Sequence, residues 1–188
     1  MGKSTLRTAG IVLGALSLAV LGACSQGADK GAEGTAQDVS QTVSGVIGGN
    51  GDLSMVAAGI EKAGLASMFD GPASYTILAP TDEALKNTAG AEGFFGKDGD
   101  GALMAAFLRE HFVSGAMTPE AIMTAIDEKG GPVTTDTFGK GSITFRKDGK
   151  TLIVTGPDGA EARITDDAIF TENGVVIPLD GLLLDIPQ

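Results

Sequence analysis

The groups best suited to acid–base chemistry in this chain are one histidine and two pairs of adjacent carboxylates. His111 is the only histidine, and it could act as a general base if a nucleophile and an orienting group converged on it. It shares a predicted helical row with Leu103 and Phe107, which favours a buried, structural imidazole. Adjacent residues on a helix do not face each other, so we interpret both carboxylate pairs as capping or solvated groups. The pairs are Asp82 with Glu83 and Asp166 with Asp167.

Two further patterns imitate a metal site and a reactive thiol. Residues 97–101 read KDGDG, like the start of a calcium-binding loop. Counted from Asp98, the twelfth position of that loop would need a glutamate and holds Arg109. Cys24 is the only cysteine, so no disulfide can form within the chain. We therefore predict no catalytic residue, no metal and no cofactor, and we expect the protein not to be an enzyme.

The N-terminal residues read as an export signal that ends at this cysteine. Lys3 and Arg7 precede an apolar stretch over residues 11–20, which is too short to be a comfortable transmembrane helix. Residues 21–24, Leu-Gly-Ala-Cys, resemble a bacterial lipobox. That resemblance implies a lipoprotein signal peptide over residues 1–23, and a membrane anchor through lipid on Cys24. An ordinary signal peptide followed by a free cysteine is the alternative.

Residues 24–44 are predicted to be a flexible tether, because Gly, Ala, Ser, Gln and Asp dominate them. Ser25 occupies the position where an aspartate would indicate retention at the inner membrane. This favours the outer membrane or the periplasmic face, and leaves the cell surface open. The formal net charge of the chain is -11, which repels phosphate backbones, so we expect no nucleic-acid partner.

Residues 75–85 are predicted to turn a corner from strand to helix. The alternating apolar and β-branched residues before Pro80 indicate a strand, and the missing N–H of this proline ends its ladder. Thr81 is placed to cap the helix that follows. Asp82 and Glu83 then lie at the positive end of its dipole.

A second stretch, residues 173–184, is predicted to form a turn and a strand buried on both faces. Asn173 and Gly174 provide the positive φ angles of a tight turn, and an apolar run follows them. Pro178 within this run belongs at a sheet edge or a bulge. Asp180 is costly to bury without partners. We interpret its carboxylate as bound to backbone amides near Thr81, with a simple bulge as the alternative.

The remaining periodicity switches from helical to alternating near residue 133. We expect a helix capped by Asp52 or Ser54 that ends at Gly64, one over residues 102–113, and one capped by Thr118. The apolar face of the first of these helices carries Leu53, Val56, Ala57 and Ile60. Hairpins follow from residue 133, with a helical turn over residues 166–170. This order predicts an α+β fold: a twisted antiparallel β-sheet or sandwich with helices packed at one face and end.

The two stretches together resemble the paired motifs of the fasciclin domain family. The first reads TILAPTDEAL and the second NGVVIPLDGLLL. Residues 108–115 are similar to the family's middle segment, with Glu110 where the family usually has Tyr before the histidine. The resemblance implies a fasciclin domain over residues 45–188. It also implies structural roles for these motif residues: Ala79, Pro80, Thr81, Asp82, Glu83, His111, Asn173, Gly174 and Asp180.

By that resemblance, the expected function is non-enzymatic adhesion or protein–protein binding. The partner would be a protein or a component of the surface or matrix. The alternative is an extracytoplasmic carrier of a small hydrophobic ligand, such as a lipid or carotenoid, because some fasciclin relatives bind carotenoids. Five methionines could line its pocket, although methionines at helical spacing are more often core residues. They are Met55, Met68, Met104, Met117 and Met123.

Overall fold

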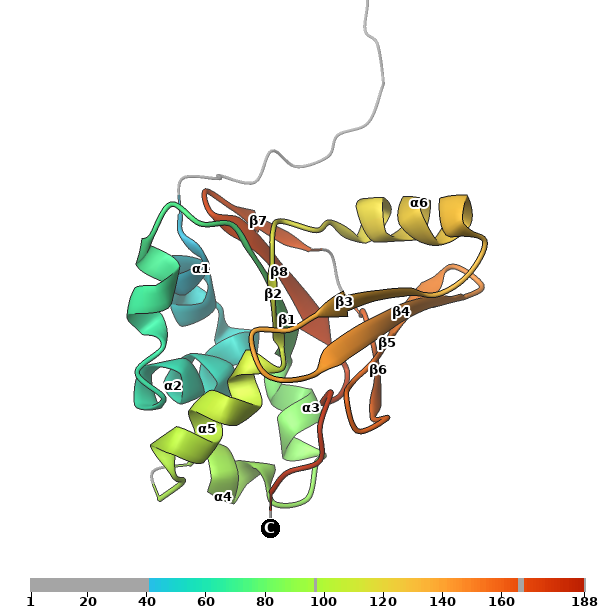
Figure 1. The fold of residues 1–188 in the computed structure, drawn as a ribbon. Coiled ribbons are helices and arrows are strands. Elements are labelled where there is room, and N and C mark those ends of the chain that lie inside the picture. The colour runs from blue at the N-terminus through green and yellow to red at the C-terminus, as the bar shows by residue number, and fades with distance from the viewer. Residues whose placement is uncertain (1–40, 97, 166–167, 188) are drawn as a thin grey trace, which may run out of the picture. The chain divides into compact units, whose positions relative to one another are not determined.

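The fold is built around two parallel strands that come from distant parts of the sequence. The computed structural model describes residues 41–96, 98–165 and 168–187. Strands β1 (Tyr75–Pro80) and β8 (Gly174–Leu179) pair in parallel along their whole length (Figure 1). Every residue of both strands is buried. The continuous apolar run predicted this for β8, whereas the alternation in the first stretch favours a half-buried strand and was wrong for β1. The two stretches singled out in the sequence therefore share one interior.

The first sheet contains both directions of pairing. Strand β2 (Phe112–Ser114) is antiparallel to β1, and β7 (Ile169–Thr171) is antiparallel to β8, giving the order β2-β1-β8-β7. The predicted antiparallel pairing is therefore found at both outer strands of this sheet, and the central pair β1–β8 differs from it. Parallel neighbours need a long crossover connection, and here most of the domain lies between β1 and β8.

Two prolines lie in this central pair without interrupting its ladder. The expectation that Pro178 lies at a sheet edge or a bulge was therefore wrong. The N–H groups of Tyr75 and Thr81 donate to the carbonyls of Asn173 and Leu179, on the β8 side of β1. The nitrogen of Pro80 is one residue out of phase with these donors, so it points to the β2 side. Strand β2 has already ended at that level. The carbonyl of Pro178 accepts from Thr165 N–H on the side away from β1, beyond the end of β7. Each missing N–H therefore points where no neighbouring strand needs it.

The second sheet is the predicted meander of hairpins, with order β3-β4-β5-β6 and antiparallel pairing throughout. Isolated bridges join it to the first sheet at two places, Val113 with Thr137 and Ile164 with Leu179. The bounds of its strands are β3 Val133–Asp136, β4 Ser142–Asp148, β5 Thr151–Thr155 and β6 Glu161–Arg163.

Helices cover one face of the central pair β1–β8, and the second sheet lies toward the other face (Figure 1). Side chains of β1 alternate between two apolar clusters: Ile77 packs among the helices, and Leu78 packs toward the second sheet. The helices are α1 Val43–Gly49, α2 Ser54–Lys62, α3 Asp82–Lys86, α4 Ala91–Phe95, α5 Gly101–Arg109 and α6 Pro119–Lys129, with 3-10 turns η1 Gly51–Leu53 and η2 Ala66–Asp70. Helix α6 packs instead on the second sheet, against β3 and β4.

Three elements differ from the prediction. Helix α5 ends at Arg109, and the chain continues as strand β2, because Phe112 and Val113 pair with β1. The helical turn expected over residues 166–170 is wrong for its last two residues, because Ile169 begins β7. Residues 166 and 167 lie outside the described residues. Val43 is fully buried, so the packed body begins before residue 45. Within the described ranges, no helix is long and apolar enough to cross a membrane.

Candidate functional site

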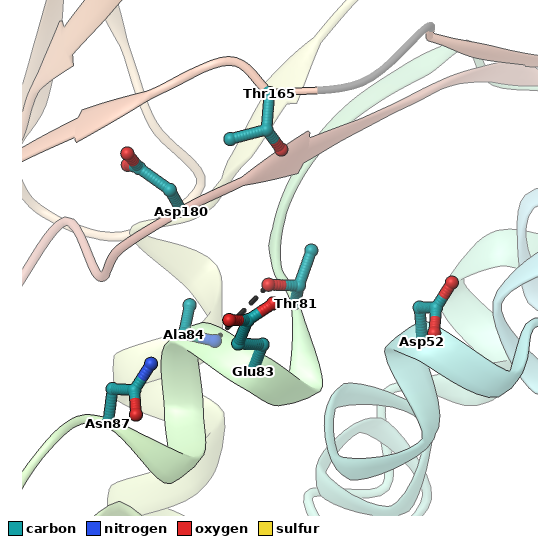
Figure 2. A pocket seen from close by; sticks show the side chains of 7 residues that line it. All are labelled: Asp52, Thr81, Glu83, Ala84, Asn87, Thr165 and Asp180. Carbon is teal, nitrogen blue, oxygen red and sulfur yellow. Dashed lines mark hydrogen bonds between the residues drawn. The ribbon is translucent and has the colours of Figure 1, made fainter.

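The corner after β1 is held by the predicted helix cap. Thr81 Oγ1 accepts the N–H of Ala84 at 3.2 Å, which satisfies one of the free amides at the start of α3 (Figure 2). Ala79 and Pro80 form the buried end of the strand. Glu83 is exposed in the first turn of α3, near the positive end of the helix dipole. The strand, its stop and the cap thus follow from local sequence alone.

Asp82 has a different role from that of its neighbour, because it is buried and caps another helix. Its carboxylate accepts the N–H of Met55 at 2.9 Å and the hydroxyl of Ser54. The residue at the N-cap position of α2, Leu53, has no side chain able to do this. The prediction that Asp52 or Ser54 caps this helix was therefore wrong. Asp82 supplies the negative charge that the start of α2 lacks.

His111 lies between α5 and β2 and is almost completely buried. Leu183 N–H donates to Nε2 at 3.2 Å, so the proton resides on Nδ1, which donates to the carbonyl of Phe107 at 3.2 Å. Burial lowers the pKa of His111 from 6.5 to about 4, against weaker raising effects from the Phe107 carbonyl and the charges of Glu110 and Asp158. Both nitrogens of a neutral imidazole are occupied, which leaves none free to act as a base.

Glu110, at the position where the family usually has Tyr, binds the turn between β3 and β4. Its two carboxylate oxygens accept Lys140 N–H at 2.7 Å, Gly141 N–H at 3.1 Å and Thr137 Oγ1–H at 2.5 Å. A Cβ added at Gly139 would lie 2.0 Å from Glu110 Oε1, so a side chain at this position would displace the carboxylate. This carboxylate ties the end of α5 to the second sheet.

The second motif begins with a buried asparagine that connects three segments. Asn173 Oδ1 accepts Val43 N–H at 2.9 Å, and its Nδ2 donates to the carbonyl of Phe69. The φ angle of Gly174 is not positive, so the expected Asn-Gly turn with positive φ at this glycine was wrong. Gly174 opens β8 instead, where an added Cβ would lie 2.2 Å from the carbonyl oxygen of Tyr75. Glycine is needed here for close backbone approach.

Asp180 follows β8 and binds β6 rather than the corner. Its Oδ1 accepts Arg163 N–H at 2.6 Å, and its Oδ2 lies 3.6 Å from the guanidinium of Arg163. The predicted partner, the amide of Thr81, donates instead to the carbonyl of Leu179 at 3.0 Å. The two motifs are therefore joined by backbone, and the carboxylate attaches β6 to the end of β8.

A polar pocket of about 490 Å³ lies between the two motifs (Figure 2). Three carboxylates lie on its wall, without a histidine, cysteine or basic side chain among the lining residues. Those residues are Asp52, Thr81, Glu83, Ala84, Asn87, Thr165 and Asp180. Across the described part of the chain, no group of His, Cys, Asp or Glu side chains is arranged to hold a metal ion. Asp100, from the calcium-like sequence, instead caps α5 by accepting Ala102 N–H at 2.7 Å.

A smaller, wholly apolar pocket of about 100 Å³ lies between α6 and the second sheet. Alanines at 121 and 125 leave space on the helix, and Phe145 is among the strand residues opposite. Met117 also lines the pocket, and it is positioned by the buried hydroxyl of Thr76, which accepts Met117 N–H at 2.8 Å. The role of Thr76 as a positioning residue was not predicted from sequence, because its partner lies far along the chain.

Comparison with known proteins identifies the family. The fasciclin domain model matches residues 51–185. The chain belongs to the fasciclin domain family. It is 25% identical over 152 residues to human Stabilin-1, covering 80% of this chain and 6% of that protein, so it spans a small part of its relative's length. It is also similar to the solved FAS1 domain pair of the insect cell adhesion molecule fasciclin I, with TM-score 0.67 and 16% identity, over 77% of this chain and 51% of that chain.

Membership in this family of adhesion-type modules confirms the predicted α+β fasciclin-like fold. In this fasciclin domain, the motif residues attach segments to one another. Thr81 and Asp82 cap helices, His111 and Asn173 bind backbone groups, and Asp180 binds β6. Cys24 lies outside the described residues. The functional roles of all these positions, and the lipid on Cys24, remain predictions.

Proposed function

We propose that this fasciclin domain is a non-enzymatic protein-binding module, held outside the cytoplasm by lipid on Cys24. The lipobox-like residues 21–24 and the apolar stretch before them support the anchor. The family of adhesion-type modules supports the binding role. The outer membrane or the periplasmic face is the favoured location, and the partner is a protein or another component of the surface or matrix.

The observation that supports protein binding most directly is the apolar pocket beside an edge strand. Strand β3 is the last strand of its sheet, and along Val133–Asp136 its described backbone pairs with β4 alone. Val133 and Thr135 of this strand line the pocket, and two alanines of α6 close the other side. An extended segment of a partner can add to such an edge through backbone hydrogen bonds and place one apolar side chain in the pocket.

Pocket size favours a partner side chain over a free pigment or lipid. Sites for drug-sized ligands are usually about 300–1,000 Å³. The apolar pocket has a volume of about 100 Å³, and the pocket of about 490 Å³ is lined by three carboxylates. Met117 lines the apolar pocket and Met123 packs beside it, whereas Met104 is fully buried in the helical core. The methionines therefore do not form one continuous hydrophobic tunnel.

The test is a crosslink from β3 in the native envelope, using a photoreactive residue in place of exposed Thr134. We expect position 134 to form an adduct with a partner protein. This adduct should be lost in Ala125→Leu, in which the larger side chain fills the pocket. It should be retained in the control Ala106→Leu, because Ala106 is an exposed residue of α5. Equal loss in both variants, or no adduct from position 134, would contradict binding at this edge. Pigment or lipid that copurifies with the wild type and is lost in Ala125→Leu would instead support the carrier function.

A further inference from the structure

The face formed by α1 and β7 lacks charged residues, in a strongly acidic protein. Residues 39–51 carry no charged side chain, although charged residues make up 20% of the chain. A shallow depression on this face is lined by uncharged residues only: Gln41, Val46, Gly49, Asn50, Gly51, Ile169 and Phe170. We call these seven residues the α1–β7 face. Phe170 is 39% exposed, one of three large apolar side chains of the described residues that face solvent to this extent.

The described chain begins on the same face, and it is fixed there. Gln41 C=O accepts the N–H of Glu172 at 2.9 Å, two residues beyond Phe170. Val43 N–H is held by Asn173 at 2.9 Å, in the same β7–β8 turn. Helix α1 packs against β7 and β8 (Figure 1). The segment that arrives from Cys24 must therefore join the domain beside Phe170.

The length of that segment limits which face can approach the membrane. Sixteen residues, 25–40, separate Cys24 from Gln41. A random coil of that length has a root-mean-square reach of about 20–24 Å. A domain of this size is roughly 40 Å across. Because this average reach is shorter than the domain, the face that carries Gln41 is on average the nearest to the lipid to which Cys24 is attached.

We propose that the α1–β7 face rests on the bilayer that holds Cys24, with Phe170 at the level of the lipid headgroups. This inference depends on the lipid anchor of the proposed function. Uncharged and apolar side chains partition into that layer at low cost, whereas the acidic remainder of the surface is kept in water. Glu172 next to the face, together with the net charge of -11, favours neutral over anionic lipids. Contact through this face would fix the orientation of the domain on the membrane, and therefore also the direction in which β3 and its apolar pocket face.

Tryptophan fluorescence can test this contact, because the chain has no tryptophan. The probe is Phe170→Trp in the full-length lipidated protein, reconstituted into phosphatidylcholine vesicles with brominated acyl chains. The matched control is Phe138→Trp, since Phe138 is also 39% exposed but lies beside β2, at the opposite edge of the first sheet. We expect a blue shift and about a twofold loss of emission for Phe170→Trp alone, since interfacial side chains lie about 5–10 Å into the boundary layer.

Each other outcome has a definite meaning. If the wild type fails to float with vesicles, or if the Cys24→Ser variant floats as well as the wild type does, the proposed lipid anchor is wrong. If the protein floats through Cys24 but Phe170→Trp is quenched no more than Phe138→Trp, the membrane contact is wrong. A blue shift that needs no lipid and grows with protein concentration would show that a second copy covers the face, and would also overturn the proposal. Should Phe170→Trp not fold, a fluorophore on Gly49→Cys reports on the same face, since a side chain there meets open space.

Discussion

The carboxylate of Asp82 accepts the backbone N–H of Met55 at 2.9 Å, at the start of a helix that precedes it in the chain. This bond joins the corner after β1 to α2, and Ser54 Oγ donates to the same carboxylate. Asp82 belongs to the first turn of α3, and its carboxylate also caps α2. The family's first motif therefore connects the end of β1 and the start of α3 to the start of α2.

Replacing Asp82 with alanine should destabilise the domain by about 1–3 kcal/mol, because the part-buried N–H of Met55 and the hydroxyl of Ser54 lose their acceptor. Urea unfolding of the mature protein measures the change. Glu83→Ala is the matched control, since Glu83 is the next residue and is exposed; it should change stability by no more than about 0.5 kcal/mol. Equal losses in the two variants would argue against a special role for Asp82.

The buried imidazole of His111 should make stability depend on pH below neutrality. Its folded pKa of about 4 lies below the unfolded value of 6.5, so the unfolded chain binds the extra proton between these values. The contribution of the neutral imidazole is complete above pH 6.5 and is lost as the pH falls to 4, a change of about 3 kcal/mol.

Unfolding curves at several pH values can isolate this contribution by comparison with His111→Gln. Glutamine does not titrate, so the variant should be less stable than the wild type at pH 7, with a smaller difference near pH 4. Carboxylates titrate in both proteins and cancel in the comparison. Parallel pH profiles for the two proteins would show that His111 is not the neutral, buried group described above.

Gly174→Ala should cost about 1–3 kcal/mol, because the new Cβ would lie 2.2 Å from the carbonyl oxygen of Tyr75 and the strands must move apart. Gly48→Ala provides the opposite case within α1, since its Cβ meets open space. There alanine should stabilise the helix by about 0.5–1 kcal/mol. Thermal unfolding should therefore shift the two midpoints in opposite directions, and a gain in both would refute the close β1–β8 approach.

Glu110→Gln should loosen the turn between β3 and β4. The amide has one acceptor oxygen, and its NH₂ group would face donors that now bind the second carboxylate oxygen. We expect hydrogen exchange at Lys140 and Gly141 to become about tenfold faster, equivalent to about 1.4 kcal/mol. Exchange in the middle of β5 serves as the internal control. An unchanged turn would mean that other contacts hold it.

Local features of the fold were predictable from sequence, whereas distant partners were not. The caps at Thr81 and Thr118 follow from neighbouring residues, and both are confirmed. The acceptor for Met55, by contrast, comes from Asp82, and no pattern in the α2 sequence indicates it. The helix expected through Phe112 ends early because pairing with β1 outweighs local helical periodicity.

The motif residues were found through resemblance, but the atoms they bind depend on the assembled fold. Asp180 was assigned to amides near Thr81, yet Arg163 takes its carboxylate, because Leu179 C=O already accepts the Thr81 amide. The uncharged lining around Phe170 was likewise invisible in sequence, since it combines residues from α1 and β7 that are far apart in the chain. Such sites become apparent only when the strands are placed.

The pairing of β1 with β8 also sets the order in which a newly made chain can complete itself. At the usual 5–20 residues per second, roughly 5–20 s pass between synthesis of Tyr75 and synthesis of its partner Gly174. Throughout that interval one side of β1 has no strand to accept or donate its hydrogen bonds. The last strand to leave the ribosome occupies the middle of the sheet, so a chain that stops short of residue 174 loses its centre rather than its border.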